Sequence, residues 1–264
     1  MSRPLDGTGV VVTRPSHQAD GLVRALEGAG AGVWRFPTLE IAAEPDDDTR
    51  LQAAHQAASA DWLVFVSQNA VEHGLPRIRA AGGPAGHARC ATVGRGTAEA
   101  LRRNGVDEVL YPRHGATSED LLAETELGRI NSGRVMIVRG VGGRPHLAET
   151  LRARGAEVGF LEVYRRIRPS ADPAPLLAAA EADQIQVVIA TSGEVLDNFL
   201  GLVGDRGRRW LARSGVVVIG ERVGAMASPH AGHVEIAATA AEEELTAATA
   251  RAARAVAEIR SRRR

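Results

Sequence analysis

Six turns in the sequence combine glycine, hydroxyl and arginine residues, and each follows a short run rich in apolar, mostly β-branched residues. The turns are Arg14, Ser67–Gln68, Gly94–Thr97, Arg139–Arg144, Thr191–Gly193 and Gly220–Arg222. Glycine lets the backbone approach a ligand closely, hydroxyls and amides bind anionic oxygens, and arginine clamps carboxylate or phosphate groups. The same residues also serve as helix caps and tight turns. Because these six turns share one register, each directly after such a run, we expect a site for a polyanionic ligand that is bound largely by backbone groups.

The runs before these turns are predicted strands, and helical stretches separate them. The strands are expected at residues 9–13, 62–66, 91–93, 135–138, 187–190 and 216–219. Alternation of strands with helices predicts an α/β fold with parallel sheets flanked by helices. In such sheets ligands bind beyond the carboxyl ends of the strands, where helix N-termini expose free amides. The six turns therefore lie where the fold class expects a binding site.

The pattern repeats with a period of 125 residues. Arg14 and Arg139 both follow a strand, and Ser67 and Ser192 both open a helix at this spacing. Leu26 and Leu151, Gly30 and Gly155, and Val33 and Val158 have the same separation, and Gly94 and Gly220 differ from it by one residue. Three strand–turn–helix units in one register indicate a duplicated architecture.

Two extended, proline-containing segments occupy equivalent places in the two repeats. They are residues 36–41, followed by the acidic turn at Asp46–Asp48, and residues 163–169, followed by the prolines at 173 and 175. Proline punctuates regular structure and is disfavoured in central strands. We therefore expect these segments to connect two domains.

Bulk composition excludes several classes of function. The chain has 264 residues, of which 44% are hydrophobic and 24% charged, as in ordinary globular proteins of one or two domains. A formal net charge of zero argues against a general nucleic-acid binder. All 32 basic residues are arginine. The absence of lysine excludes Schiff-base chemistry and a phosphate-loop lysine.

Known metal, cofactor and targeting motifs are also missing. A lone Cys90 allows no intramolecular disulfide, and the pair His230 and His233 lacks a third ligand in a predicted surface loop. Asp46–Asp48 is expected to be a solvated turn. The glycine turns at 94–99 and 140–145 depart from the dinucleotide fingerprint, and no Gly-x-Ser-x-Gly elbow surrounds Ser67. Without an apolar signal core or membrane-length run, we expect a cytoplasmic protein.

An ordered set of sequence blocks resembles the uroporphyrinogen-III synthase family. The blocks are Val11–Pro15 with Gln18–Ala19, Phe36–Ile41, Asp61–Val71, Ala91–Gly94 with Thr97–Ala98, Arg139–Arg144, Glu162–Arg166 and Thr191–Gly193. They follow the family order between about residues 9 and 237. The resemblance implies two similar α/β domains, one of them discontinuous, joined by a two-stranded linker. The first would comprise residues 1–36 plus 170–264, the second residues 40–164, and the linker residues 36–41 and 163–169.

The resemblance also implies a reaction. Enzymes of this family convert linear hydroxymethylbilane, which bears acetate and propionate groups, into uroporphyrinogen III during haem and cobalamin biosynthesis. Water is lost, ring D is inverted through a spiro intermediate and the macrocycle closes, so the activity is that of a cofactor-free, metal-free carbon–oxygen lyase. Because the substrate cyclises unaided to the uninverted type I isomer, the main task of the enzyme is conformational.

Site residues follow from the family motifs. Tyr164 is the candidate catalytic residue, as a hydrogen-bond partner of the leaving hydroxyl or, alternatively, a buried linker tyrosine without a chemical role. The substrate-binding candidates are Arg14, Ser67, Gln68, Thr97, Arg139, Gly142, Arg144, Ser192, Gly193 and Arg222. Val223 departs from the family pattern, because it stands where a hydroxyl residue equivalent to Thr97 is often found.

Two other classes of function stay open at this point. One is an inactive two-domain module that binds bilanes or porphyrinogens, and the other is a nucleotide-binding α/β enzyme, whose fingerprint glycines are missing. For the cyclase we expect hydroxymethylbilane as the small-molecule partner, a transient contact with hydroxymethylbilane synthase, a monomer, and no nucleic-acid or membrane partner.

Overall fold

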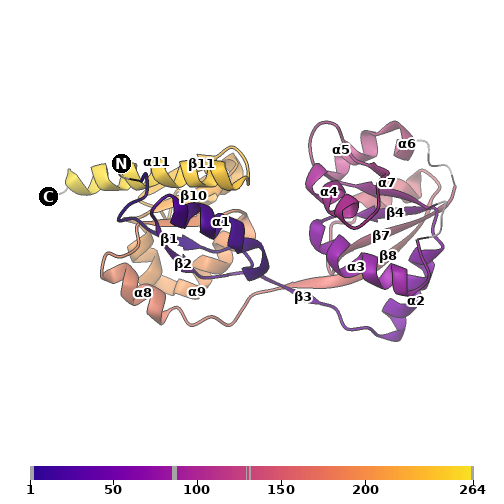
Figure 1. Cartoon of the computed structure of the whole chain (residues 1–264), viewed down its shortest axis with the longest axis horizontal. Helices are drawn as coiled ribbons and strands as arrows, with labels where there is room; N and C mark the ends of the chain where they lie inside the picture. Colours follow the sequence, from indigo (N-terminus) through magenta and orange to yellow (C-terminus); the bar gives the residue numbers. More distant parts are fainter. Residues whose placement is uncertain (1–2, 85–87, 129, 131, 263–264) are drawn as a thin grey trace. The chain divides into compact units, whose positions relative to one another are not determined.

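The computed structural model describes residues 3–84, 88–128, 130 and 132–262. Its contacts divide the chain into two compact units (Figure 1): unit 1 comprises Met1–Glu40 and Ile167–Arg264, and unit 2 comprises Ile41–Arg166. Unit 1 is thus discontinuous in sequence, and the chain passes between the units twice. The ends of the first predicted domain, residues 1–2 and 263–264, lie outside the described residues.

Unit 1 is built on a five-stranded sheet with the order β11-β10-β9-β1-β2, in which all four neighbouring pairs are parallel. Its strands are β1 (Gly9–Val12), β2 (Gly32–Arg35), β9 (Val187–Ala190), β10 (Gly215–Ile219) and β11 (His233–Ala237). Its helices are α1 (Ser16–Gly28), α8 (Ala174–Glu181), α9 (Gly193–Leu211), α10 (Glu221–Ala227) and α11 (Glu242–Ser261). Apolar residues of α1 and α11 pack on one face, and those of α8, α9 and α10 pack on the other.

Unit 2 contains a six-stranded sheet with the order β3-β8-β7-β4-β5-β6. Its strands are β3 (Glu40–Ala43), β4 (Trp62–Phe65), β5 (Arg89–Thr92), β6 (Val109–Leu110), β7 (Arg134–Gly140) and β8 (Glu157–Ile167). Its helices are α2 (Asp48–Ala58), α3 (Gln68–Ala80), α4 (Arg95–Arg103), α5 (Ser118–Ala123), α6 (Thr125–Gly128) and α7 (His146–Ala153).

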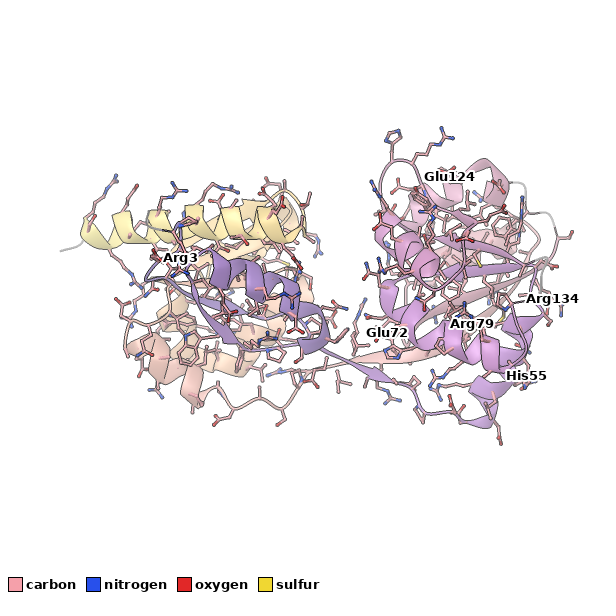
Figure 2. The ribbon with its side chains drawn as sticks, viewed as in Figure 1. Arg3, His55, Glu72, Arg79, Glu124 and Arg134 are labelled. Carbon is pink, nitrogen blue, oxygen red and sulfur yellow. The ribbon has the colours of Figure 1, made fainter. Side chains whose placement is uncertain are left out.

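Strand periodicity explains how the sheet of unit 2 is covered on both faces. Leu63 and Phe65 of β4 pack with α2, α3 and α4, whereas Trp62 and Val64 pack with α5 and α7. Successive side chains of a strand point to opposite faces, so a strand buried on both sides is a continuous apolar run. Polar residues such as Glu72 of α3 lie on the exposed sides of the helices (Figure 2).

The topology confirms the predicted repeat. Val10 of β1 is the register partner of Val187 in β9, and Val135 of β7 is the register partner of Trp62 in β4. The two pairs are equivalent, because Val135 lies 125 residues after Val10 and Trp62 lies 125 residues before Val187. Apart from β3, the two sheets have equivalent strand orders. With β3 left aside, each sheet takes two adjacent strands from one repeat and three from the other, so the repeat and the compact unit are different divisions of the chain.

The predicted α/β class with parallel sheets is confirmed, and the six predicted strands are present with ends within two residues of the expected ones. β3 and β8 are neighbours in the sheet of unit 2 and carry both connections between the units (Figure 1). His233 begins β11, so the expectation of a loop there is wrong at that residue. None of the helices within the described ranges is long and apolar enough to cross a membrane.

Candidate active site

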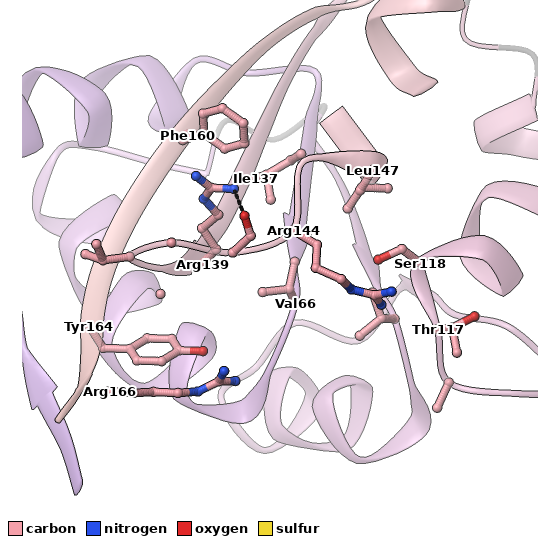
Figure 3. A pocket seen from close by; sticks show the side chains of 16 residues that line it. Val66, Thr117, Ser118, Ile137, Arg139, Arg144, Leu147, Phe160, Tyr164 and Arg166 are labelled. Atoms are coloured by element: carbon pink, nitrogen blue, oxygen red, sulfur yellow. Dashed lines mark hydrogen bonds between the residues drawn. The ribbon is translucent and has the colours of Figure 1, made fainter. Parts of the chain in front are cut away.

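A pocket of about 320 Å³ lies at the carboxyl edge of the sheet in unit 2 (Figure 3). Its walls come from the ends of β4, β5 and β7, from β8, from the loop after β7 and from the start of α5. The lining residues include Val66, Val93, Thr117, Ser118, Arg139–Arg144, Leu147, Phe160, Tyr164 and Arg166. This is the edge at which parallel sheets bind ligands, and the volume falls at the small end of the usual range for ligand pockets.

A bulge between β7 and β8 aims the tyrosine at this pocket. Arg139 pairs with Glu162, but the next residue, Gly140, pairs with Tyr164, so β8 contains one extra residue. A bulge of this kind re-aims the side chains that follow it. A Cβ atom at position 140 would lie 2.6 Å from Cε2 of the Tyr164 ring, which only glycine avoids. The bulge and the glycine together bring the ring against the end of β7.

The hydroxyl of Tyr164 lies 3.0 Å from Oγ of Ser67, and either oxygen can be the donor. Ser67 is the N-cap of α3, and its Oγ accepts a hydrogen bond from the N–H of Ala70 at 3.1 Å. Tyr164 is only 3% exposed, with the ring of His73 at 6.2 Å between centroids. A buried, hydrogen-bonded phenol at a pocket wall is positioned to donate to a ligand atom with little loss of conformational freedom.

Arg139 is held in place by its own surroundings. Its Nε and Nη2 donate to one carboxylate oxygen of Glu162 at 3.1 and 2.8 Å, and its Nη1 donates to the carbonyl of Gly143 at 3.1 Å. Its guanidinium carbon lies 3.9 Å from the ring centroid of Phe160 (Figure 3). The sequence predicts a ligand-binding arginine here. In the structure Arg139 lines the pocket, and its hydrogen bonds to Glu162 and Gly143 also hold the loop after β7 against β8.

Arg144 and Arg166 supply further positive charge around the pocket. Arg166 follows Tyr164 by two residues on β8, and the two side chains lie together in Figure 3. Arg144 is exposed, with Nη1 at 3.5 Å from a carboxylate oxygen of Glu119, a distance too long for a strong ion pair. Gly142, between Arg139 and Arg144, has a φ of +76° that L side chains rarely adopt, which shapes this loop. The pocket is thus lined by arginine side chains and by the backbone of the loop after β7.

The remaining candidates of unit 2 lie beside the pocket. Gln68 is the first residue of α3, and its side-chain nitrogen lies close to Gly96 of α4, at 2.9 Å from where a Cβ atom would stand. Thr97, in the first turn of α4, is 7% exposed. The structure brings these two residues to adjacent helix N-termini at the same sheet edge, but neither lines the pocket.

Four candidates belong to unit 1. Ser192 caps α9, with Oγ accepting from the N–H of Val195 at 3.3 Å, and Gly193 lies beside Arg222, whose Nη1 would be 3.6 Å from a Cβ atom at 193. These three residues share one region of the sheet edge of unit 1. Arg14 instead donates from Nη2 to the carbonyl of Ala240 at 2.9 Å, and burial lowers its pKa.

The pocket wall formed by the start of α5 was not predicted from the sequence. Thr117 and Asp120 form a capping box: the Thr117 Oγ accepts from the N–H of Asp120 at 3.1 Å, and the Asp120 carboxylate accepts from the N–H of Thr117 at 3.0 Å. The hydrogen bond from the Thr117 hydroxyl lowers the pKa of Asp120. The Thr-x-x-Asp spacing is a sequence signal for a helix start. Ser118 follows this cap and lines the pocket beside Arg144 (Figure 3).

The chemistry available at the pocket is that of binding and hydrogen bonding. Arginines and backbone amides suit carboxylates, and one phenol–serine pair offers a polarised hydroxyl. Among the residues that the structure describes, no three histidine, cysteine, aspartate or glutamate side chains are grouped as metal ligands would be.

Comparison with known proteins identifies the family. The family model described as uroporphyrinogen-III synthase HemD matches residues 20–247. The chain belongs to the uroporphyrinogen-III synthase family. It is 34% identical to the uroporphyrinogen-III synthase of Salmonella typhimurium over 220 residues, which cover 83% of this chain and 89% of the relative. Against the Synechococcus elongatus enzyme it is 31% identical over 245 residues, covering 89% and 91% of the two chains.

Solved structures of this family share the fold. A crystal structure of a mutant uroporphyrinogen III synthase from Thermus thermophilus matches with a TM-score of 0.64 at 20% identity, covering 94% of this chain and 99% of that one. The enzyme of Helicobacter pylori matches with a TM-score of 0.57 at 14% identity, covering 92% and 98%. These similarities confirm the two-domain α/β architecture.

Proposed function

We propose that the chain is a uroporphyrinogen-III synthase that cyclises hydroxymethylbilane with inversion of ring D and loss of water. The C–O bond of the terminal hydroxymethyl group breaks, and the bonding electrons leave with the oxygen. The resulting electron-poor carbon is attacked by a pyrrole carbon of ring D, and the macrocycle closes after inversion. The proton taken up by the departing hydroxyl is balanced by the proton that the ring-closing pyrrole loses. The reaction is that of a carbon–oxygen lyase and consumes no other reactant.

The observation that carries this proposal is the combination of arginines and a buried phenol in one pocket. Arg144, Arg166 and the backbone after β7 are suited to bind acetate or propionate groups. The Tyr164 hydroxyl, 3.0 Å from Ser67, is suited to donate a hydrogen bond to the departing hydroxyl. Donation from Ser67 to Tyr164 would stabilise the negative charge that such donation creates on the phenol oxygen. Tyr164 is therefore the proposed catalytic residue.

The other candidates have binding roles in this proposal. Gln68 and Thr97 of unit 2, and Arg14, Ser192, Gly193 and Arg222 of unit 1, are proposed to bind substrate carboxylates through side chains or helix N-terminal amides. Arg139 is proposed to contribute to substrate binding indirectly, by holding the loop after β7 in place. We further propose a cytoplasmic monomer that receives its unstable substrate by transient contact with hydroxymethylbilane synthase.

An isomer assay tests the function. Hydroxymethylbilane is generated in situ by its synthase, the protein is added, and the products are oxidised and separated by chromatography as type I and type III uroporphyrin. We expect mainly type III product, in proportion to the amount of protein. Type I product alone, unchanged by a high concentration of folded protein, would contradict the proposal and favour an inactive bilane-binding module.

A further inference from the structure

The backbone next to Tyr164 in β8 accepts hydrogen bonds from side chains of neighbouring helices. Arg50 of α2 donates from Nε to the carbonyl of Glu162 at 3.3 Å, and Arg77 of α3 donates from Nη1 to the carbonyl of Val163 at 3.0 Å. Two arginines from two helices thus hold consecutive carbonyl groups just before the tyrosine. Backbone groups of a strand are normally satisfied within its sheet, so side chains from two helices at this point mark a special arrangement.

One carboxylate connects these contacts. Glu44 follows β3, and its carboxylate binds Arg50 and also Arg165, whose Nη2 lies 2.8 Å from Oε2. The N–H of Glu44 donates to the carbonyl of Val163 at 3.0 Å, and the carbonyl of Glu44 accepts from Arg77. We call Glu44, Arg50, Arg77 and Arg165 the Glu44 cluster. It holds the residues on both sides of Tyr164.

Glu44 is the buried centre of the cluster. Its side chain is 0% exposed, whereas Arg165 is 54% exposed and Arg50 and Arg77 are 20% and 18% exposed. The hydrogen bond from Arg165 and the nearby guanidinium groups lower the pKa of this carboxyl despite its burial. A buried charge is tolerated only when it is paired and hydrogen-bonded, and a hydrophobic group would often serve stability as well. A role beyond stability is therefore worth testing.

We propose that Glu44 is a positioning residue for Tyr164: with its three arginines it fixes the 162–165 backbone so that the phenol stays at the pocket wall. The inference rests on the proposed catalytic role of Tyr164. The carbonyl of Tyr164 itself accepts from the N–H of Val141 at 2.8 Å, which ties the tyrosine to the loop after β7 on its other side. Disruption of the Glu44 cluster removes one of these two attachments of the Tyr164 backbone.

The primary test removes the negative charge of the Glu44 side chain and keeps its shape. Glu44→Gln preserves side-chain length but loses the ion pairs to Arg50 and Arg165. We expect kcat for type III product to fall about 10- to 100-fold, because a misplacement of about 1 Å can cost that much, while KM changes little. Circular dichroism at the assay temperature establishes that the variant is folded. The control, Glu181→Gln, breaks an arginine ion pair of unit 1, with Arg206, and keeps wild-type kcat.

A double-mutant cycle distinguishes positioning from general damage. If Glu44 acts through the phenol, Glu44→Gln causes little further loss once Tyr164→Phe has removed the hydroxyl, because coupled residues are non-additive. If the fold-loss in kcat of the double variant equals the product of the losses of the two single variants, the two residues act independently and the proposal is overturned.

A second pair of variants keeps the test decisive if Glu44→Gln does not fold. Arg77→Met removes the donor to the carbonyls of Val163 and Glu44. Arg79→Met changes the same residue type on the same helix (Figure 2), but the Arg79 side chain donates to the carbonyl of Asn104. We expect Arg77→Met to lower kcat and Arg79→Met to leave it unchanged. Equal activity of the two variants would overturn the proposal.

Failure of the inference and failure of the proposed function give different results. If the wild-type protein yields only type I product, the function itself is wrong and so is the inference. If the wild type makes type III product and Tyr164→Phe is slow, but folded Glu44→Gln retains wild-type kcat, only the inference fails.

Discussion

Substitution of Gly140 by alanine tests the geometry that brings Tyr164 to its pocket. The added methyl group would lie 2.6 Å from Cε2 and 2.7 Å from Cζ of the tyrosine ring. Carbon atoms in good contact are about 3.5 Å apart, so the ring must retreat by roughly 0.9 Å. Its hydroxyl, now 3.0 Å from Ser67, would then move out of hydrogen-bond range or tilt away from the pocket.

The same displacement of the Tyr164 ring sets the expected losses of stability and of kcat. Overpacking of a filled interior costs about 1–3 kcal/mol, and for a unit of this size the melting temperature falls by about 4 °C per kcal/mol. Because a misplaced catalytic group costs up to about 100-fold in rate, we expect kcat for type III product to fall by about 10- to 100-fold. The assay is steady-state formation of type III uroporphyrin, combined with thermal unfolding followed by circular dichroism.

Gly28→Ala is the matched control, because a methyl group added at the end of α1 would point into open space, with no heavy atom within 4 Å apart from the neighbouring residues and the nearby backbone of its own helix. It should keep wild-type kcat and change stability by less than about 1 kcal/mol. If Gly140→Ala instead retains both the wild-type kcat and the wild-type melting temperature, the close approach of Tyr164 to the end of β7 is wrong.

Three further predictions concern pH, packing and thiol chemistry. Glu44 has a folded-state pKa below the usual 4.5 because Arg165 and the other arginines hold it ionised, so its stabilisation is complete above that pH and is lost as pH falls through the lower folded value. Accordingly, the difference in melting temperature between wild type and Glu44→Gln should be constant above about pH 5 and shrink in more acidic buffer; a difference independent of pH would contradict this. Val223, 5% exposed, packs in the core of unit 1, so Val223→Thr should destabilise the protein by about 1–2 kcal/mol in urea unfolding without raising kcat, and a gain in activity would refute this assignment. Burial raises the pKa of Cys90 to about 11, so a thiol-alkylating reagent at pH 8 should label the native protein slowly and the urea-unfolded protein quickly; equal rates would be the contrary result.

The strands and the repeat could be predicted because the decisive signal is local. Runs such as Trp62–Phe65 and Val187–Ala190 are buried on both faces, so they appear in the sequence as uninterrupted apolar segments. The 125-residue spacing then gives the strand order of one sheet once the other is known. The capping box at Thr117 was equally local and could have been found by its Thr-x-x-Asp spacing.

The parts that could not be predicted depend on partners far apart in sequence. The extra residue of β8 beside Gly140 is visible only when β7 is paired with β8. Arg139 has the composition of a ligand-binding residue, and only the structure reveals its bonds to Glu162. The acidic turn was expected to be solvated. It does hold exposed Asp48, but Glu44, just before it, is buried among arginines from α2, α3 and β8.

We propose that the hydroxyl of Tyr164 assists loss of the substrate hydroxyl at this pocket. The most direct measurement compares kcat for type III product between Tyr164→Phe and Tyr111→Phe, since the chain has only these two tyrosines and Tyr111 packs under Arg102 instead. We expect Tyr164→Phe to be slower by about 10²-fold or more, as for loss of a general acid, with substrate affinity retained and Tyr111→Phe unaffected. Equal kcat values for folded Tyr164→Phe, Tyr111→Phe and wild-type protein would contradict a catalytic role of the Tyr164 hydroxyl.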